Sequence, residues 1–473
     1  MENRRLHPCP GAVWLLLVGL LLGAPAGGRA AAPEGECWLT RTDRTALFQK
    51  QPGGLRFDAP PGAGPVIEID DAQTYQTIAG FGFTLTGGSA RLLQRLPAAV
   101  RADLLRELFA TDRTNIGVSY LRLSLGASDL DERVFSYDDL PPGQTDPTLA
   151  RFSLAPDEEA LIPMLREILA VQPAVALLAT PWSAPAWMKQ PPDTRGGRLR
   201  PELAAVYARY FVKYLQGMRA AGIPIGAVTV QNEPLNGNNQ PSQLMTAPEQ
   251  AALIKHHLGP ALRAAGLGAQ IILYDHNADH PEYPLAILAD PGVRPFVAGS
   301  AFHLYAGSIG ALSRVHEAHP DKAVYFTEQW MSAPGNLGGD LGWHLRQVLV
   351  GATRNWSSVV LEWNLAADEH QQPHTAGGCE RCLGALTIAG REVTRNPAYY
   401  VIAHAAKFVR PGSVRVASSL PPNLPNVAFR TPDGRRVLIV LNAAGDEAAL
   451  QIQFHETRAA VRLPAGAAAT YVW

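Results

Sequence analysis

The sequence predicts an α/β fold in which a (β/α)8 barrel, or TIM barrel, carries an antiparallel β-sandwich built from both ends of the chain. Three observations predict this fold. Apolar, β-rich runs alternate with amphipathic stretches through the middle of the chain, which is typical of a parallel sheet covered by helices. Eight such units over about 300 residues fit a closed barrel. Shorter runs of alternating polarity, without helices between them, flank this region on both sides.

Residues 1–30 are typical of a secretory signal peptide. Arg4 and Arg5 precede an apolar run from Gly11 to Ala24, and small residues follow it. This run of about 14 residues is shorter than the roughly 20 that a membrane-spanning helix needs, so a cleaved signal is favoured over an anchor. We therefore expect an exported protein without an integral membrane span after cleavage. It would be secreted or periplasmic, or lysosomal in a eukaryotic host.

The barrel strands are predicted from eight apolar runs. They are Ile78–Thr86, Ser119–Leu125, Ala174–Pro181, Gly226–Gln231, Gln270–Tyr274, Phe296–His303, Ala323–Thr327 and Ser357–Trp363. Five stretches between them carry apolar residues at helical spacing, namely Leu92–Phe109, Asp157–Val171, Pro201–Ala221, Pro248–Ala265 and Leu341–Arg354. A doubly wound open sheet is the rival, but it usually brings a glycine-rich phosphate loop after its first strand. Gly80–Thr84 lacks the third glycine of that loop, so the barrel is favoured.

The sandwich is predicted from six runs with apolar and polar residues at period two, separated by turns rich in proline and glycine. The runs are Val414–Ala417, Asn426–Arg430, Arg436–Leu441, Ala448–Phe454, Ala459–Leu463 and Ala469–Trp473. Strands expected early in the chain have no helix partners and should join the same sandwich. The predicted domains are therefore residues 31–75 and 409–473 for the sandwich, and residues 76–408 for the barrel.

The composition excludes several functional classes. With 47% hydrophobic and 18% charged residues, the 473-residue chain has enough apolar material for a large core, so it is not mainly disordered. Lys and Arg number 41 against 42 Asp and Glu, which leaves no basic excess for a nucleic-acid partner. His256 and His257 are adjacent on a predicted helix and point to different faces, so they cannot chelate a metal together. We expect neither a metal nor a cofactor.

Cys37, Cys379 and Cys382 remain after the predicted signal is removed. Cys379 and Cys382 form a C-x-x-C motif, but no second pair completes a four-ligand zinc site. In an oxidising compartment the motif indicates a local disulfide across a loop or a pair of buried thiols.

Two glutamates end predicted barrel strands, where barrels place their catalytic groups. Glu233 follows the fourth strand and Glu328 the seventh, so we expect their side chains to face each other across the barrel mouth. Two converging carboxyls are what glycoside hydrolysis needs: one protonates the leaving oxygen, and the other attacks the anomeric carbon or activates water. Their separation, which distinguishes retention from inversion, is not readable from sequence.

Other strand ends supply groups suited to a sugar, whose hydroxyls accept polar contacts and whose C–H faces stack on aromatic rings. We take as candidate binding residues Arg122, Asp129, Trp182, His303, Tyr305, Trp363 and Asn364. Trp187 is a further candidate for lining a cleft after the third strand. Arg122 would also keep Glu328 ionised if the two lie side by side.

The chain resembles glycoside hydrolase family 30, in particular its acid β-glucosidase (glucosylceramidase) branch. The resemblance rests on an ordered set of motifs from about residue 37 to the C-terminus. The motifs include Gly82–Thr86, Tyr120–Ser124, Pro181–Lys189, Gln231–Pro234, Phe326–Trp330 and Arg395–Tyr400.

The resemblance implies hydrolysis with retention, with Glu233 as the general acid/base and Glu328 as the nucleophile. It also implies that Asn232 bonds the sugar 2-hydroxyl and that Asp129, Trp182 and Trp363 hold the outer hydroxyls. Arg122, His303 and Tyr305 would orient the nucleophile. The chain departs from the lysosomal members at Gly87–Ser89, where they carry an acidic residue, and at His374–Thr375, where they carry an Asn-Trp pair.

Three functional hypotheses follow. The leading one is a secreted β-glycosidase that hydrolyses a β-glucosidic bond by double displacement, of glucosylceramidase type. The second is a β-1,6-glucanase or a β-xylosidase on the same scaffold, and the third is a non-catalytic carbohydrate-binding protein. The expected partner is a carbohydrate or glycolipid substrate, while surface contact with lipid and the oligomeric state stay open.

Overall fold

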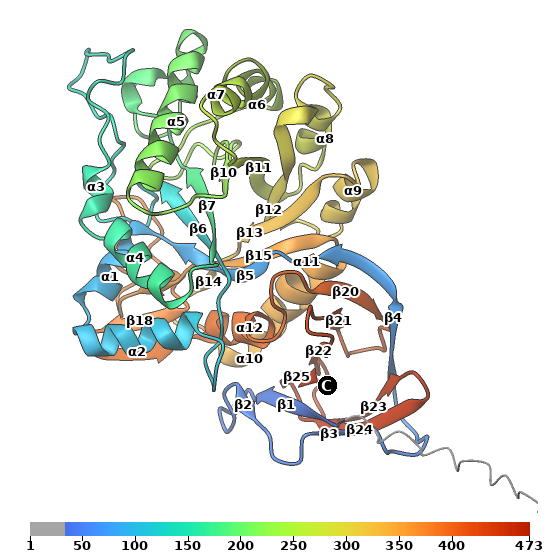
Figure 1. The fold of residues 1–473 in the computed structure, drawn as a ribbon. Helices are drawn as coiled ribbons and strands as arrows, with labels where there is room; N and C mark the ends of the chain where they lie inside the picture. Colours follow the sequence, from blue (N-terminus) through green and yellow to red (C-terminus); the bar gives the residue numbers. More distant parts are fainter. Residues whose placement is uncertain (1–33) are drawn as a thin grey trace, which may run out of the picture. The chain divides into compact units, whose positions relative to one another are not determined.

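A computed structural model describes residues 34–473 (Figure 1), so the predicted signal peptide lies outside the described residues. Eight parallel strands close a barrel, and each of the eight predicted runs overlaps one of them, although four strands extend beyond the predicted run. In barrel order they are β5 (Gly80–Leu85), β6 (Tyr120–Leu125), β7 (Ala176–Pro181), β10 (Ala227–Thr229), β11 (Gln270–Ala278), β12 (Val297–Gly307), β13 (Ala323–Glu328) and β15 (Ser357–Asn364). The predicted fold class is confirmed.

The interior of the barrel is filled by a layer of buried side chains, including Tyr120, Leu178, Ile272, Tyr325 and Leu361. Successive strand residues point to opposite sides, so alternate residues fill this layer and the others face the helices. The layer closes the barrel below its mouth. Polar groups at the carboxyl ends of the strands therefore lie above an apolar floor.

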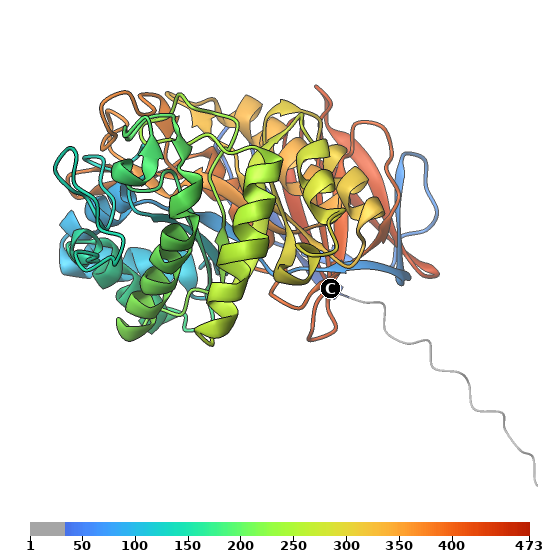
Figure 2. The same ribbon diagram turned by 90° about the horizontal axis from the view of Figure 1, so that it is seen from above.

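Helices cover the outside of the barrel (Figure 2), but most predicted helices are divided. The predicted helix at Leu92–Phe109 is two helices, because Pro97 has no backbone N–H to continue the first. The stretches at 248–265 and 341–354 each contain a central π-helical segment, Ile254–Leu258 and His344–Val350. The helices are α1 (Gly87–Arg95), α2 (Ala98–Phe109), α3 (Ala155–Glu158), α4 (Leu161–Val171), α5 (Ala204–Ala220), α6 (Ala247–Leu253), α7 (Gly259–Ala264), α8 (Glu282–Leu288), α9 (Ala311–Ala318), α10 (Leu337–Trp343), α11 (Gly351–Arg354) and α12 (Pro397–Ala406).

The sandwich draws strands from both ends of the described chain, as predicted. Its ladder runs in the order β2 (Gln49–Lys50), β1 (Glu34–Thr40), β25 (Ala468–Val472), β22 (Arg436–Leu441), β21 (Asn426–Arg430), β20 (Val414–Ser418), β4 (Val66–Thr77), β23 (Ala448–Phe454) and β24 (Thr457–Leu463), with β3 (Leu55–Arg56) beside β1. The pairing of β4 with β23 is parallel, whereas the other pairs of this sheet are antiparallel. A second apolar core lies within this sheet.

Helix α12 joins the two domains, since it contacts both β5 of the barrel and β25 of the sandwich. His404 on this helix is fully buried, and its ring nitrogens lie 2.8 Å from the hydroxyls of Thr40 and Thr470. Burial lowers the pKa of His404 to about 3, so its ring is neutral. One neutral imidazole thus links the helix to strands from both chain ends.

Small sheets shape the loops after the barrel strands. They are built from β8 (Lys189–Gln190), β9 (Arg198–Leu199), β14 (Met331–Ser332), β16 (Ala366–Ala367), β17 (Cys382–Leu383), β18 (Leu386–Ala389) and β19 (Glu392–Arg395). Between residues 34 and 473, no helix is both long and apolar enough to span a bilayer.

Candidate active site

The carboxyl ends of the barrel strands surround a cavity of about 280 Å³, here called the sugar pocket. It is lined by Asp129, Trp182, Glu233, Asn236, Asn239, Asn277, Tyr305, Glu328, Trp330, Trp363, Cys379 and Cys382. Glu233 and Glu328 both face this cavity from strands three places apart in the barrel. The structure therefore brings the two predicted carboxyls together.

Glu233 is placed by backbone that leaves the barrel ladder early. Strand β10 ends at Thr229, after which Asn232 N donates to Pro181 O at 2.8 Å and Glu233 N donates to Asp275 O at 2.9 Å. Glu233 has a φ of 44°, a left-handed conformation that costs energy in a residue with a Cβ. The neighbouring hydrogen bonds hold this conformation and turn the carboxyl into the pocket.

The Glu233 carboxylate accepts hydrogen bonds on both oxygens. Asn236 Nδ2 and Asn239 Nδ2 donate to Oε2 at 2.8 and 3.0 Å, while His303 Nδ1 lies 3.3 Å from Oε1. Burial would raise the pKa of Glu233, but the hydrogen bond and charge of His303 lower it to about 2. The two asparagines were not predicted from sequence, because they lie in a loop beyond the strand end.

Glu328 ends β13 and is held by two donors. Arg122 Nη1 donates to its Oε2 at 2.5 Å, and Tyr305 OH donates to its Oε1 at 2.8 Å. Burial raises the pKa of Glu328 above its ordinary value, against the opposing charges of His303 and Arg122. Arg122 therefore pairs with Glu328 as predicted, but it does not by itself hold the pKa of that carboxyl low.

Asp275 is fully buried, contacts the same Arg122 and His303 that contact the glutamates, and was missed by the sequence analysis. It accepts a hydrogen bond from Arg122 Nη2 at 2.9 Å, and His303 Nε2 lies 3.2 Å from its Oδ1. Three threonine hydroxyls also donate to it, those of Thr180, Thr229 and Thr327. Burial opposes its charge, but Arg122 and His303 hold its pKa well below the usual range. The available signal was its position directly after the fifth predicted strand.

A break in β11 turns Asp275 inward. Tyr274 and Asp275 have φ values of 70° and 64°, and the pairing of β11 with β12 shifts register between Tyr274 and His276. Such a bulge re-aims a side chain at the rim of a barrel. The carboxylate that anchors Arg122 and His303 thus depends on a local distortion of the strand.

His303 lies between the acidic groups. Besides its contacts with Glu233 and Asp275, its Nδ1 is 3.8 Å from Glu328 Oε1. Burial would lower the pKa of His303, but the charge of Glu328 and the hydrogen bonds to Asp275 and Glu233 raise it to about 9. The imidazole therefore carries a proton next to both glutamates at neutral pH.

Asp129, Trp182 and Trp363 form another wall of the sugar pocket. The two indole rings have centroids 5.5 Å apart, and the Arg122 guanidinium lies 4.8 Å from the Trp182 ring. Burial, followed by the charges of Glu328 and Glu233, raises the pKa of Asp129 to about 7. This wall offers aromatic surface and one hydrogen-bonding carboxyl to a sugar.

Several predicted residues lie outside the lining of the pocket. Arg122, Asn232 and His303 are buried and are not among its lining residues, and Asn232 Oδ1 accepts a hydrogen bond from Arg122 Nη2 at 2.6 Å. Asn364 is buried, with its Nδ2 3.4 Å from Cys382 O. Trp187 is buried as well, and its indole N–H donates to a backbone carbonyl. Asn364 and Trp187 therefore support loops rather than face the cavity.

Glu233, His303 and Glu328 present ligand atoms that all lie within 4.8 Å of one another, close enough for a metal ion. Both oxygens of Glu328 already accept hydrogen bonds, from Arg122 and Tyr305. The Glu233 oxygens are likewise occupied by amide donors and His303. The arrangement is that of a hydrogen-bonded carboxyl pair, and the expectation of no metal stays a prediction.

Comparisons with known proteins agree with this geometry. Residues 78–409 match the glycosyl hydrolase family 30 TIM-barrel domain, and residues 412–471 match the family 30 β-sandwich domain. An endo-1,6-β-D-glucanase of Neurospora crassa is 34% identical over 93% of this chain and 93% of its own. A solved endo-β-1,6-glucanase has a TM-score of 0.87 and 32% identity, covering 93% of this chain and 99% of its own. The lysosomal acid glucosylceramidase of Mus musculus is 27% identical over 87% and 84% of the two chains.

Proposed function

The chain belongs to glycosyl hydrolase family 30, and from this premise we propose that it is a retaining glycosidase that hydrolyses β-1,6-linked glucan. The relatives named endo-1,6-β-glucanases support this substrate, since they are more similar to the chain than those named glucosylceramidases. The alternative hypothesis of the sequence analysis thus becomes the leading one. Glucosylceramide remains the second candidate substrate.

One observation carries the proposal of retention: the facing atoms of Glu233 and Glu328 lie no more than 4.8 Å apart. Retaining glycosidases place their carboxyls about 5–5.5 Å apart, whereas inverting ones leave about 6.5–9.5 Å for a water molecule. The short separation favours direct attack by one carboxylate on the anomeric carbon. The covalent glycosyl-enzyme would then be hydrolysed with help from the other carboxyl.

Glu328 suits the role of nucleophile. Its two oxygens are fixed by Arg122 and Tyr305, which orient the carboxylate toward the pocket. Both donors would also stabilise the carboxylate when it leaves the sugar in the second step. Asn232, bonded to the same guanidinium, is the proposed partner of the sugar 2-hydroxyl.

Glu233 suits the role of acid and base because a proton is stored beside it. His303 carries this proton, and its Nδ1 lies 3.3 Å from Glu233 Oε1. Transfer to Glu233 gives the neutral acid that protonates the leaving oxygen. Glu233 and His303 titrate as a coupled pair, so the low pKa of Glu233 reflects the state in which His303 holds the proton.

We also propose that the protein acts outside the cytoplasm. The composition of residues 1–30 supports export, and the Cys379–Cys382 disulfide suits an oxidising compartment.

A substrate panel tests the proposed function. It contains a linear β-1,6-glucan, an aryl β-glucoside, an aryl β-xyloside and a fluorescent glucosylceramide. We expect the glucan to be hydrolysed with the highest kcat/KM, and NMR spectroscopy to show the β-anomer as the first product. Hydrolysis of glucosylceramide without the glucan would overturn the substrate, and an α-anomer as first product would overturn retention.

A further inference from the structure

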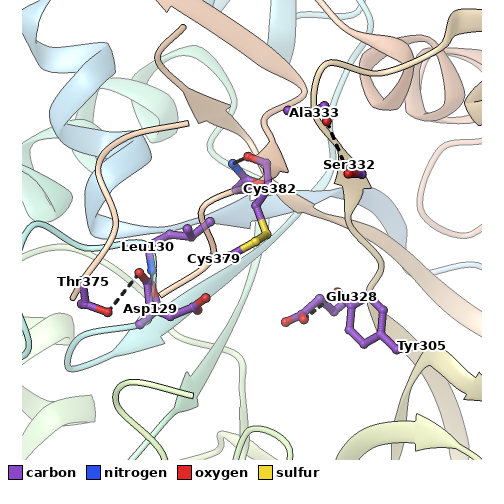
Figure 3. The surroundings of a disulfide bond; sticks show 11 residues. Asp129, Leu130, Tyr305, Glu328, Ser332, Ala333, Thr375, Cys379 and Cys382 are labelled. Carbon is purple, nitrogen blue, oxygen red and sulfur yellow. Dashed lines mark hydrogen bonds between the residues drawn. A yellow bond between two sulfur atoms is a disulfide. The ribbon is translucent and has the colours of Figure 1, made fainter. Parts of the chain in front are cut away.

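The C-x-x-C motif lies in the wall of the sugar pocket. The structure joins Cys379 and Cys382 in a disulfide, one of the two states that the sequence allowed. Both residues line the cavity with Glu233 and Glu328. Figure 3 shows the side chains of Asp129 and Glu328 on either side of the disulfide. The bond is therefore part of the surface that a bound sugar would meet.

The segment before the disulfide is fixed to Asp129. Thr375 N donates to Asp129 O at 2.9 Å, and the Thr375 hydroxyl donates to Gln240 O at 2.6 Å. A Cβ at Gly378 would lie only 2.4 Å from Asp129 O, so this close approach requires glycine. The backbone N–H of Cys379 favours the ionised Asp129 carboxylate. The position of residues 375–379 is therefore tied to that of Asp129.

The second half of the C-x-x-C motif is fixed to the chain that continues from Glu328. Cys382 on β17 pairs with Ser332 on β14, and Ala333 N donates to Arg381 O at 2.8 Å. Strand β14 begins at Met331, three residues beyond Glu328. The disulfide thus connects the wall that carries Asp129 with the wall that carries Glu328.

The two cysteine side chains also pack with the aromatic wall. Trp182, Trp363 and Cys382 belong to one apolar cluster, with Trp330 and Cys379 packed against it. Sulfur is polarisable and packs favourably against aromatic rings. A change in the disulfide would therefore disturb the indole surfaces as well as Asp129.

We propose that the Cys379–Cys382 disulfide is a specificity-determining element of the sugar pocket. It fixes the spacing between the Asp129 wall and the Glu328 wall, so the pocket keeps its width only while the bond is intact. This inference rests on the proposed glycosidase function. It assigns the disulfide to substrate binding and leaves the proton transfer to Glu233 and the nucleophilic attack to Glu328.

The alternative is a purely structural disulfide, which stabilises the loop without affecting substrate binding. The two roles give different kinetics. Loss of a purely structural disulfide would lower the thermal midpoint of unfolding and leave KM unchanged in the folded enzyme. A specificity-determining element raises KM for a glycan more than it lowers kcat, because the catalytic groups stay in place while the binding wall loosens.

Reversible reduction of the folded enzyme is the first test. A dithiol such as dithiothreitol transfers two electrons and two protons to the disulfide, giving two thiols, and is itself oxidised to a cyclic disulfide. We expect KM for the β-1,6-glucan to rise about tenfold, with kcat changed less than threefold, and both to recover on reoxidation. A KM within twofold of the oxidised enzyme, with mass spectrometry confirming both thiols, would overturn the proposal.

The second test replaces both cysteines by serine, in the variant Cys379→Ser/Cys382→Ser. It should show the raised KM without reductant and no further response to dithiol. Cys37→Ser is the matched control, since Cys37 is the free cysteine of residues 34–473 and lies in the sandwich. It should behave like the unsubstituted enzyme in both redox states. If the double variant does not fold, the reduction experiment decides alone.

The role of the disulfide can be tested even if the proposed substrate is wrong. If the oxidised enzyme hydrolyses another β-glycoside in place of the glucan, the same reduction series is run on that substrate. A rise in KM would then support the disulfide inference although the proposed substrate had failed. A fall in kcat at unchanged KM would contradict the inference with any substrate.

Discussion

His303 and His404 are both fully buried, yet their surroundings drive them to opposite protonation states. At the barrel mouth, His303 faces three carboxyls, and its pKa is raised to about 9. At the junction of barrel and sandwich, His404 faces two threonine hydroxyls, and burial lowers its pKa to about 3. Burial disfavours the charged form in both places, so the partners decide the sign of the net shift.

This comparison separates a charged site from a structural junction. The mouth concentrates Arg122, His303 and four acidic residues above an apolar floor, where each charge depends on the others. The junction satisfies its polar atoms with neutral groups, which cost less to bury. Changes at the mouth should therefore alter turnover and its pH dependence, while changes at the junction should alter stability.

The largest expected effect is at Glu328. Glu328→Gln keeps the size of the side chain but removes the nucleophile, so kcat should fall by roughly 10⁴- to 10⁶-fold. Substrate binding, measured by calorimetry with the β-1,6-glucan, should persist. Turnover near that of the unsubstituted enzyme would show that Glu328 is not the nucleophile.

Glu233→Ala should lower kcat by about 10²- to 10⁴-fold, the usual contribution of a general acid or base. With an aryl glycoside that needs little protonation, the second step should become limiting. Added azide should then restore part of the rate and yield a β-glycosyl azide, detected by mass spectrometry. An α-glycosyl azide, or no product of this kind, would argue against the role of Glu233.

Asp275→Asn should lower kcat/KM by about 10- to 100-fold, the equivalent of the ~1.5–3 kcal/mol that a hydrogen bond to a charged group contributes.

In the unsubstituted enzyme, activity should fall as pH drops through the raised pKa of Glu328 and as pH rises through about 9, where His303 loses its proton. Asp275 raises the pKa of His303. In the variant, the fall in activity on the alkaline side of the pH profile should therefore begin at a lower pH.

Asp157→Asn is the control for Asp275→Asn. Asp157 is also a buried carboxyl, bonded by Tyr137 OH at 2.5 Å, but it does not line the sugar pocket. Its variant should keep the pH profile of the unsubstituted enzyme. If Asp275→Asn loses activity at the same alkaline pH as the unsubstituted enzyme, Asp275 does not set the pKa of His303.

His404→Gln should act on stability alone. The pKa of His404 is about 3 in the folded state and about 6.5 when unfolded, so the unfolded chain binds more protons between these values. This residue's contribution to the unfolding free energy is therefore present above pH 6.5 and lost as pH falls toward 3. The variant should lose less stability on acidification, measured by urea unfolding, with kcat unchanged. A changed kcat would show that the junction communicates with the mouth.

A chelator should have the smallest effect. Because hydrogen-bond donors already occupy the oxygens of Glu233 and Glu328, we expect kcat/KM to remain within twofold after dialysis against EDTA. Loss of activity that returns with an added divalent cation would identify the cluster of Glu233, His303 and Glu328 as a metal site.

The sequence predicted the fold more completely than the site. Periodicity located all eight barrel strands and the six C-terminal sandwich strands, because buried strands need continuous or alternating apolar residues over several positions. The division of the helices was not predicted, because a proline or a π-helical segment interrupts the backbone hydrogen bonds of a helix without changing its apolar pattern.

Strand ends revealed Glu233 and Glu328, because the carboxyl ends of barrel strands form one rim. The same rule did not reveal Asp275, whose inward orientation depends on the break in β11. Asn236 and Asn239 belong to a loop whose path no periodic pattern encodes.

By itself, the sequence determined which strands form the barrel and which residue types stand at its mouth, because both follow from local spacing along the chain. The tertiary structure decided which of these groups share protons and which walls the Cys379–Cys382 bond connects. Those properties depend on distances of a few ångströms between segments more than 100 residues apart, such as Arg122 with Asp275 and Asp129 with Thr375.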